Sequence, residues 1–426
     1  MNGSGATGSG SLWRHADFLK LWAAQSVSSL GARITREGLP FAAVMSLGAS
    51  PAQVGILAAL ARGPAILVGL TAGGVVDRSR RRPLLIGADL GRALVLATIP
   101  LAAWSRVLTM NQVYGVAAAV GALSVFFDIA DHAYLPSLIA RDHLVDGNSK
   151  LAITDSIAEI GGPALYGVLF QFLTAPIAIA VNAGTYLFSA AALATIRSRE
   201  PAPTPGSVRR RADLVGDFRL GLGAALADPA VRTLLAMTTA AALFGAFFSA
   251  LYIVFAVRTL HLAATMLGAT VAVGGVAALF GAALAAPLIR RFGIGPTFVA
   301  TSIVAAAGSV FVPLAHGAPL VAMGMLMISQ LIGDSFGTVS EICGRSLRQS
   351  LVPPHMMGRV GGVFAVAPGI TGITGAILGG WLGGVIGARP TLLIACAGVT
   401  LAAAIGLVSP LVRLRDAELR VASEAP

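Results

Sequence analysis

The sequence predicts an all-α membrane protein with twelve transmembrane helices, arranged as two pseudo-symmetric six-helix bundles. Three observations support this fold class. Of the 426 residues, 56% are hydrophobic and only 12% are charged, whereas soluble domains carry about 25% charged residues. The apolar residues form runs of about 20, the length at which a helix crosses hydrocarbon about 30 Å thick. The chain also resembles itself at a shift of 213 residues, half its length.

The first six spans are predicted within residues 17–196, after a disordered cytoplasmic tail at 1–16. The second and third spans are the clearest, because 54–76 is apolar apart from Arg62 and 83–104 is apolar apart from two residues. Between them, residues 73–82 (GGVVDRSRRR) place an acidic residue and four arginines in a short stretch. Such a cluster is typical of a very short loop at a membrane surface.

The second six spans are predicted within residues 228–413 because the halves match at the shift of 213. Asp77-Arg78 falls on Arg290-Arg291, and Pro83 falls on Pro296. Such internal repeats are typical of transporters that bind substrate between two bundles, near the membrane midplane. The proline- and arginine-rich residues 197–227 are predicted to be a cytoplasmic linker, and 414–426 a cytoplasmic tail.

The distribution of positive charge predicts the orientation. A net charge of +11 would suggest nucleic acid as the partner of a soluble protein. Here the arginines gather in loops after alternate predicted helices, and positive loops mark the cytoplasmic side. Both termini are therefore predicted to be cytoplasmic, with the protein multi-pass in the inner membrane. The lipid bilayer is the expected partner, and nucleic acid is not.

The sequence contains no motif that indicates an enzyme. Cys343 and Cys396 both lie in apolar runs, so neither a disulfide framework nor a metal site is indicated. Nucleotide-binding loops of the form GxxxxGK[ST], GxSxG elbows and HExxH motifs are missing from the sequence. We therefore expect no catalytic residues, no cofactor and no bound metal.

The loop after the second predicted span carries a recognisable pattern. Gly73, Asp77, Arg78, Arg81 and Arg82 fit the loop motif of the major facilitator superfamily of secondary transporters, with Arg80 in place of a second glycine. The whole chain resembles the twelve-helix drug and siderophore exporter branch and is similar to macrolide efflux proteins. The segments that carry this likeness are FLKLWAAQSVSSLG, LPSLIARDHLVDGNS and SLVPPHMMGRVGG.

The resemblance implies roles for several further residues. Asp89 and Arg92, near the loop motif, resemble the partners that form the cytoplasmic gate in this family. Gly162, Pro163 and Gly167 match part of the antiporter motif of the fifth helix, with Tyr166 at a glycine position. The arginine that drug–proton antiporters often carry in helix four is missing from this sequence. Proton coupling must therefore use other residues.

Charged residues inside predicted spans are costly and need a functional or structural reason. In the first helix Gln25, Ser29, Arg33 and Glu37 share one face. We expect this face to line a wet cavity, with Arg33 and Glu37, four residues apart, able to pair. The alternative is a static ion pair near the outer end of the helix.

Four other acidic residues are candidates for proton or substrate binding. Asp128 and Glu341 are equivalent under the shift of 213, and either carry a proton or lock the cytoplasmic gate by salt bridges. Asp334 lies deeper in its predicted helix and is the better proton carrier, with Glu159 in helix five as the second candidate. Glycines at 375, 379, 383 and 387 predict close packing of the eleventh helix.

Together these features predict a secondary active transporter that exports a small amphiphilic organic molecule, such as a drug, secondary metabolite or siderophore. We expect alternating access, protons as the coupling ion, and function as a monomer. The alternatives are an importer of a small solute, or a membrane sensor or scaffold that has kept the fold without transport.

Overall fold

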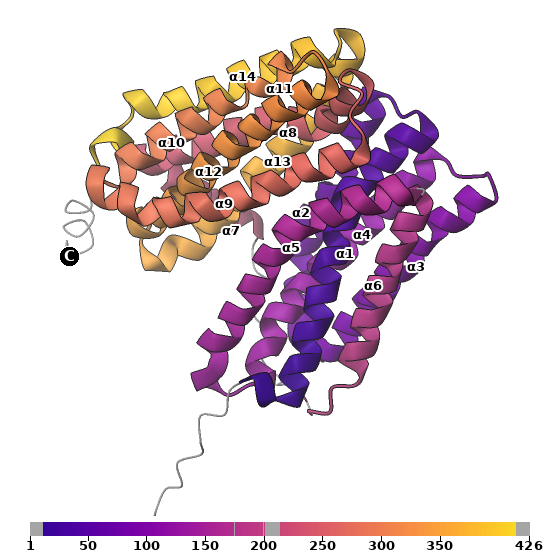
Figure 1. The fold of residues 1–426 in the computed structure, drawn as a ribbon. Helices are drawn as coiled ribbons and strands as arrows, with labels where there is room; N and C mark the ends of the chain where they lie inside the picture. Colours follow the sequence, from indigo (N-terminus) through magenta and orange to yellow (C-terminus); the bar gives the residue numbers. More distant parts are fainter. Residues whose placement is uncertain (1–11, 174, 199, 201–213, 415–426) are drawn as a thin grey trace, which may run out of the picture.

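A computed structural model describes residues 12–173, 175–198, 200 and 214–414 of the chain. The described residues form helices and no strands (Figure 1). The first half comprises α1 (Ala16–Leu47), α2 (Pro51–Arg78), α3 (Arg81–Trp104), α4 (Met110–Leu138), α5 (Leu144–Phe172) and α6 (Ala175–Ala194). The second comprises α7 (Leu214–Ala227), α8 (Pro229–Arg258), α9 (Ala264–Phe292), α10 (Ile294–Gly308), α11 (Phe311–Leu314), α12 (Pro319–Leu351), α13 (Met357–Val385) and α14 (Ala388–Ala404).

The helix bounds repeat at the shift of 213. Adding 213 to the bounds of α5 (144–172) gives 357–385, which are the bounds of α13. In the same way α2 maps onto α9, and α1 maps onto α8 within a few residues at its end. In the second half the counterpart of α3 is divided into α10 and α11. The two pseudo-symmetric six-helix bundles are therefore confirmed at the level of individual helices.

Nine helical segments in the described residues are long and apolar enough to span a membrane. Three long helices, α1, α2 and α5, are not among the nine. Their symmetry counterparts α8 and α9, and the segment Pro354–Val385 that contains α13, do belong to the nine. The symmetry therefore supports the prediction of six spans in each half.

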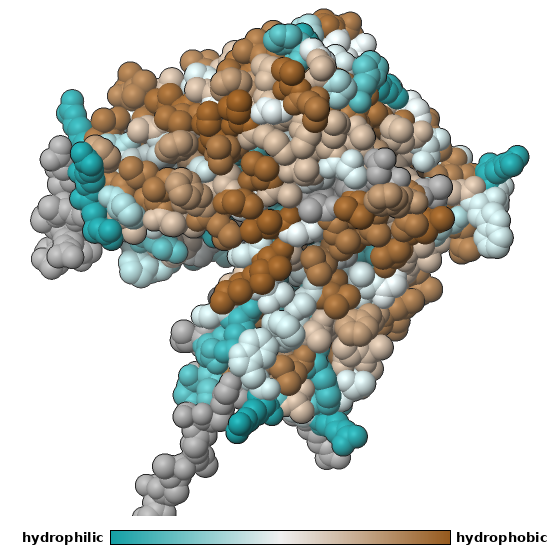
Figure 2. Space-filling view, in the orientation of Figure 1, coloured by the Kyte–Doolittle hydropathy of each residue, from teal (hydrophilic) through white to brown (hydrophobic). Residues whose placement is uncertain are grey.

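The surface fits insertion in lipid. Large apolar side chains point outward on many helices, among them Leu94 (68% exposed), Leu101 (60%) and Leu401 (69%). Figure 2 shows hydrophobic residues over much of the visible face, with hydrophilic residues gathered at the extremities. Lipid rather than water is therefore the natural neighbour of these helices.

The loop between α2 and α3 is shorter than the charged cluster suggested. The helix α2 continues through Arg78, and α3 begins at Arg81, so Ser79 and Arg80 alone connect them. Asp77 belongs to the last turn of α2, while Arg81 and Arg82 form the first turn of α3. We call the end of the molecule that holds this loop and the start of α1 the inner end, and the opposite end the outer end.

The two halves meet at their outer ends. Here α2 packs against α13, and α5 packs against α9. Near the outer end, the backbone of Gly55 on α2 contacts Ala376 and Gly380 on α13. Beside it, Arg258 at the end of α8 donates a hydrogen bond of 2.8 Å to the backbone oxygen of Ala49. From this junction the halves diverge towards their inner ends (Figures 1 and 2).

The glycine repeat of the eleventh span packs as predicted, with one correction. Cβ atoms at Gly375, Gly379 and Gly383 would collide with α8, so these glycines allow α13 and α8 to approach closely. Gly387 is not part of this strip, because α13 ends at Val385. It instead precedes α14 with φ +91°, a conformation that glycine adopts without strain.

Candidate transport site

The polar face of α1 lies against α5 and forms a ladder of side-chain contacts. Trp22 Nε1 donates to Thr154 Oγ1 at 2.9 Å. About two turns further on, Ser29 Oγ donates to Asp155 Oδ1 at 2.8 Å. The ladder arises because polar residues recur in α1 at three- and four-residue spacing, which places them on one side of the helix.

The ladder reaches an ion pair at the level of Arg33, but its partner is not the predicted one. Arg33 Nη1 donates to Glu159 Oε1 at 2.6 Å, and Nη2 contacts the other carboxylate oxygen. The predicted pairing of Arg33 with Glu37 is therefore wrong. Gly162 explains the difference, since a Cβ there would lie only 2.5 Å from Arg33 Cβ. Without that atom, α5 approaches α1 closely enough for a two-point contact.

Glu159 also faces the second half. A Cβ at Gly275 on α9 would lie 2.9 Å from the Cα of Ile160 and 3.2 Å from the backbone oxygen of Glu159. One residue earlier on α9, Gly274 lies directly against the carboxylate of Asp334 on α12. The Asp334 and Glu159 carboxylates are close enough to interact electrostatically across the two halves.

These residues belong to a larger set of charges that we call the central polar cluster. Each member is Arg33, Glu37 or Glu159, or interacts electrostatically with one of these three. The members are Arg33, Arg36, Glu37, Arg62, Asp155, Glu159 and Asp334. Three arginines therefore face four carboxylates. Arg33, Glu159 and Asp334 lie near the midpoints of their helices, where a transporter of two bundles binds its substrate.

The sequence motifs do not single out Arg62 or Tyr252, although both belong to this neighbourhood. Arg62 was noted only as an interruption of an apolar run, yet it lies near Arg36 and Glu37. Tyr252 on α8 faces both Glu37 and Asp334. Tyr252 could have been found from the sequence, because a tyrosine hydroxyl within a long apolar span needs a polar partner.

The other two acidic candidates lie outside the central polar cluster. Glu341 forms an ion pair with Arg345, one turn further along α12. Asp128 is exposed on α4, where it interacts electrostatically with Arg92, with His132 and, at the edge of the cluster, with Asp155. On the same helix, Asp131 accepts a hydrogen bond from Gln25 of α1.

Asp89 and Arg92 lie inside the first half rather than between the halves. They form an ion pair of 2.5 Å, with Asp89 fully buried and Arg92 only 3% exposed. The Arg92 guanidinium stacks over the rings of Phe127 and Tyr186, at 4.3 Å from each ring centre. Arg92 also donates to Ser124 Oγ at 3.4 Å. In this conformation the pair forms the polar core of the first bundle.

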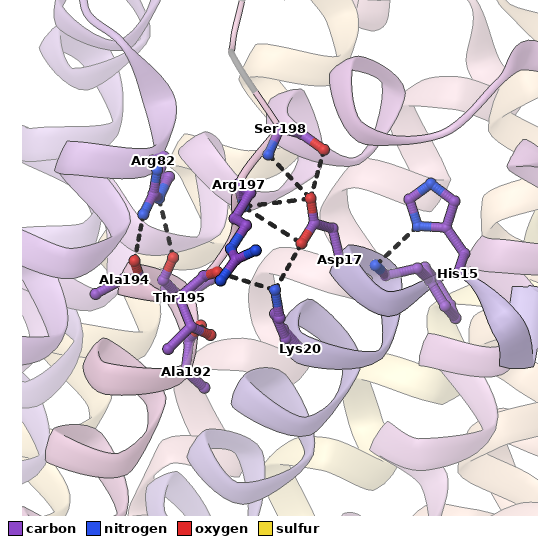
Figure 3. Close-up of polar contacts among 11 residues, drawn as sticks. His15, Asp17, Lys20, Arg82, Ala192, Ala194, Thr195, Arg197 and Ser198 are labelled. Carbon is purple, nitrogen blue, oxygen red and sulfur yellow. Dashed lines mark hydrogen bonds and ion pairs between the residues drawn. The ribbon is translucent and has the colours of Figure 1, made fainter.

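The arginines of the loop motif hold the inner end of the first half. Arg82 Nε donates to the backbone oxygen of Leu193 at 2.9 Å, near the end of α6. Figure 3 shows Arg82 beside Ala194, whose backbone oxygen accepts a second hydrogen bond from Arg82. Glu200 accepts hydrogen bonds from the backbone nitrogens of Arg81 and Arg82 at the start of α3. The side chains of Gly73, Asp77, Arg78, Pro163 and Gly167 lie outside the described part of the structure.

A second group of contacts at the inner end joins α1 to the segment after α6. Asp17 accepts hydrogen bonds from Lys20 at 2.8 Å and from the backbone and hydroxyl of Ser198 at 2.9 and 2.6 Å. Figure 3 shows Asp17 between Lys20, Arg197 and Ser198. The start of the linker is thereby attached to the first half.

The fold and the central polar cluster together define a polytopic membrane transporter of two repeated bundles. The family model of the Major Facilitator Superfamily matches residues 21–376. The chain belongs to this superfamily.

Relatives and solved structures agree with this assignment. The chain is 27% identical to the multidrug efflux pump Tap of Mycolicibacterium fortuitum, covering 88% of this chain and 91% of Tap. It is also 27% identical to the uncharacterized MFS-type transporter YfiS of Bacillus subtilis, over 88% of this chain and 89% of YfiS. Its fold is similar to the nucleoside transporter NupG, with a TM-score of 0.73, 15% identity and coverage of 96% and 100%. A bacterial homologue of the iron transporter ferroportin, in an inward-facing state, has a TM-score of 0.70, 18% identity and coverage of 93% and 98%.

Proposed function

We propose that this protein is a proton-coupled exporter of small amphiphilic organic molecules, working by alternating access in the cytoplasmic membrane. The observation that carries the proposal is the central polar cluster, in which charges from both halves meet near the midpoints of their helices. A charge in the membrane interior is costly, so this concentration requires a function. The similarity to the efflux pump Tap supports the outward direction.

Asp334 is proposed as the proton carrier. With all groups ionised, the four carboxylates and three arginines of the cluster leave one excess negative charge. One proton on Asp334 neutralises that excess and removes its repulsion from Glu159. Because these two residues belong to different halves, loading and releasing the proton changes the energy of bringing the halves together.

The conformation supports the proposed cycle. The halves are in contact at the outer end and apart at the inner end, as an inward-open state requires. We propose that the inner end faces the cytoplasm, with both termini there, and that the loop motif closes this end in the outward-open state. A single copy contains both halves of the cluster, which supports function as a monomer.

The test is transport in inverted membrane vesicles, with and without a proton gradient, over a panel of antibiotics and small metabolites. In such vesicles the cytoplasmic face is outside, so an exporter accumulates substrate when the lumen is acidic. We expect accumulation of at least one amphiphilic compound, abolished by a protonophore. Uptake only in right-side-out vesicles favours an importer. Lack of movement of any panel compound in either orientation favours a sensor or scaffold.

A further inference from the structure

The second half contains a half-open cavity that the central polar cluster does not explain. Its volume is about 620 Å³, and its walls come from α8, α10, α12, α13 and α14. Met237, Phe248 and Phe298 contribute to a lining that is mostly apolar. Every lining residue belongs to the second half, so the cavity lies within one bundle rather than between the two.

The pseudo-symmetry explains why this space is open. In the first half, the equivalent position holds the polar core described above, with Asp89 and Arg92 packed on Phe127 and Tyr186. Adding 213 to these four positions gives residues with much smaller side chains in the second half. They are Ser302, Ala305, Ser340 and Val399, and all four line the cavity.

The loss of these side chains was not compensated by inward movement of the helices. Ser302 and Ser340 hydrogen-bond each other at 2.6 Å on the cavity wall. Their hydroxyls are therefore partnered, although the large side chains of the other half are missing. Protein interiors are normally close-packed, with few voids larger than a water molecule. A retained cavity of this size is within the range of about 300–1,000 Å³ that holds drug-sized ligands.

The inner end of the cavity carries charge. Glu341, Arg345 and Arg348 line it there, close to the end of α12 at Leu351. Glu341 and Arg345 pair with each other. Arg348 stacks over the ring of Phe364 at 5.2 Å, and within the described residues it forms no ion pair. The charges at this end therefore sum to one positive, next to an apolar chamber.

We propose that this cavity binds an amphiphile with an apolar body and a single anionic group, the body lying in the chamber and the anion facing Arg348. This assignment deepens the proposed function by naming a substrate class, and it rests on that function for its role in transport. The binding itself depends only on the cavity and its charged end. An anion at Arg348 leaves the Glu341–Arg345 pair intact, whereas a cation would have to displace Arg345 from Glu341.

The test uses 11-(dansylamino)undecanoic acid as the probe and its methyl ester as the uncharged comparison. Binding is measured by fluorescence to the full-length protein in phosphatidylcholine nanodiscs, after subtraction of empty nanodiscs. The cavity is filled by Ser340→Phe with Val399→Tyr, which introduces the residues of the other half. The control is Ala307→Phe, a similar enlargement at an exposed position of α10 outside the cavity.

We expect saturable binding of the acid, weakened at least tenfold by the filled variant and unchanged by Ala307→Phe. A charge-assisted hydrogen bond contributes about 1.5–3 kcal/mol, so Arg348→Gln weakens binding of the acid about tenfold or more. The same substitution weakens binding of the ester less than twofold. If the filled variant is not monodisperse, Ala305→Leu replaces it, with a smaller loss in the same direction.

Equal binding to the wild type and the cavity-filling variants would overturn the proposal, as would equal losses of acid and ester in Arg348→Gln. The variant Asp334→Asn distinguishes failure of the cavity proposal from failure of the transport proposal, because it changes the proposed proton carrier and leaves the cavity unaltered. Unchanged probe binding with lost uphill transport supports both ideas. Transport that persists in a variant with a filled cavity removes the cavity from the transport cycle, even if the probe binds.

Discussion

At the scale of single residues, Glu159 has the most connected position in the chain. It receives two contacts from Arg33 in its own half and faces Asp334 in the other. A carboxylate held between a cation and a second carboxylate is sensitive to the charge on both. If Asp334 takes up a proton, as we propose, its repulsion of Glu159 is removed. The ion pair within the first half is therefore linked to the protonation of the second.

The first prediction tests Asp334 as the coupling residue. Asparagine has nearly the same shape but carries no proton that it can exchange. We expect Asp334→Asn to abolish efflux against a concentration gradient while sparing substrate binding and passive exchange, measured in inverted vesicles and by counterflow. The control is Asp142→Asn, because the side chain of Asp142 is 78% exposed and lies outside both the central polar cluster and the cavity of the second half.

Two outcomes would change the assignment. If Asp334→Asn still transports uphill while Glu159→Gln does not, the coupling residue is on α5 rather than α12. If both variants transport normally, proton coupling through these carboxylates is wrong.

A second prediction concerns the cost of separating Arg33 from Glu159. Arg33→Gln leaves Glu159 facing Asp334 without its cation. Glu159 has 48% of its side chain exposed, so we expect a destabilisation below the roughly 3–5 kcal/mol typical of a broken buried pair. The double variant Arg33→Gln with Glu159→Gln removes both charges and regains most of the thermal stability of the protein in detergent. A double variant that is less stable than either single variant contradicts this interpretation.

The residue scale also shows what the sequence could predict. The polar face of α1 follows from the spacing of its residues, and in the structure Ser29 and Arg33 on this face contact α5. The wet cavity along this face stays a prediction. The ion-pair partner of Arg33 could not be predicted from local spacing, because Glu159 lies 126 residues away. The packing role of Gly162 was also missed, because this glycine was interpreted as part of a motif. Local spacing made Glu37 the natural partner, and the close approach of α5 overrode it.

At the scale of helices, hydropathy predicted the spans well and their ends less well. The apolar run 54–76 corresponds to α2 (Pro51–Arg78), and 83–104 to α3 (Arg81–Trp104). The ends differ because charged residues continue a helix beyond the apolar part, as Asp77 and Arg78 do in α2. The empty cavity of the second half could not be predicted, since it depends on which small residues face one another across helices.

A third prediction tests the outer contact between α2 and α13. A Cβ at Gly55 would collide with the backbone oxygen of Ala376, whereas the nearest atom to a Cβ at Gly63 is 3.8 Å away. Gly55→Ala should therefore separate the outer ends of the halves, and the same change at Gly63 should not. We measure this by labelling Ala59→Cys, which is buried between the halves, with a membrane-impermeant maleimide. Equal labelling in the Gly55→Ala and Gly63→Ala variants would show that the helices accommodate the extra methyl group without separation of the outer ends.

At the scale of the whole molecule, the pseudo-symmetry requires that both termini lie on the same side, since each half contributes six spans. The positive loops predict that this side is cytoplasmic.

A fourth prediction follows for cysteines introduced at two positions. Ser207→Cys, in the linker outside the described residues, should react with impermeant maleimide only from the cytoplasmic face. Asn111→Cys, at the start of α4, should react only from the outside. The natural Cys343 and Cys396 are buried and give a low background. Labelling of Ser207→Cys from outside would show that the predicted orientation is wrong.

The last prediction concerns how the inner end closes. The halves diverge at the inner end, and Asp77 lies in the last turn of α2, the helix that also forms the outer contact with α13. Rocking the halves about their contact must bring the inner ends of these helices together. We expect the anion of Asp77 to act when the inner end is closed, by binding a cation or a helix start of the other half.

We therefore expect Asp77→Asn to reduce transport sharply while leaving protein in the membrane and probe binding to the inward-open state unchanged. Labelling should show the inner end open more of the time. The control is Asp142→Asn, an acid of the same half whose side chain is 78% exposed, and it should transport normally. Normal transport by Asp77→Asn would mean that the charge has no part in closure. The inner end would then have to be held by the arginines that, in the inward-open state, attach α3 to the end of α6.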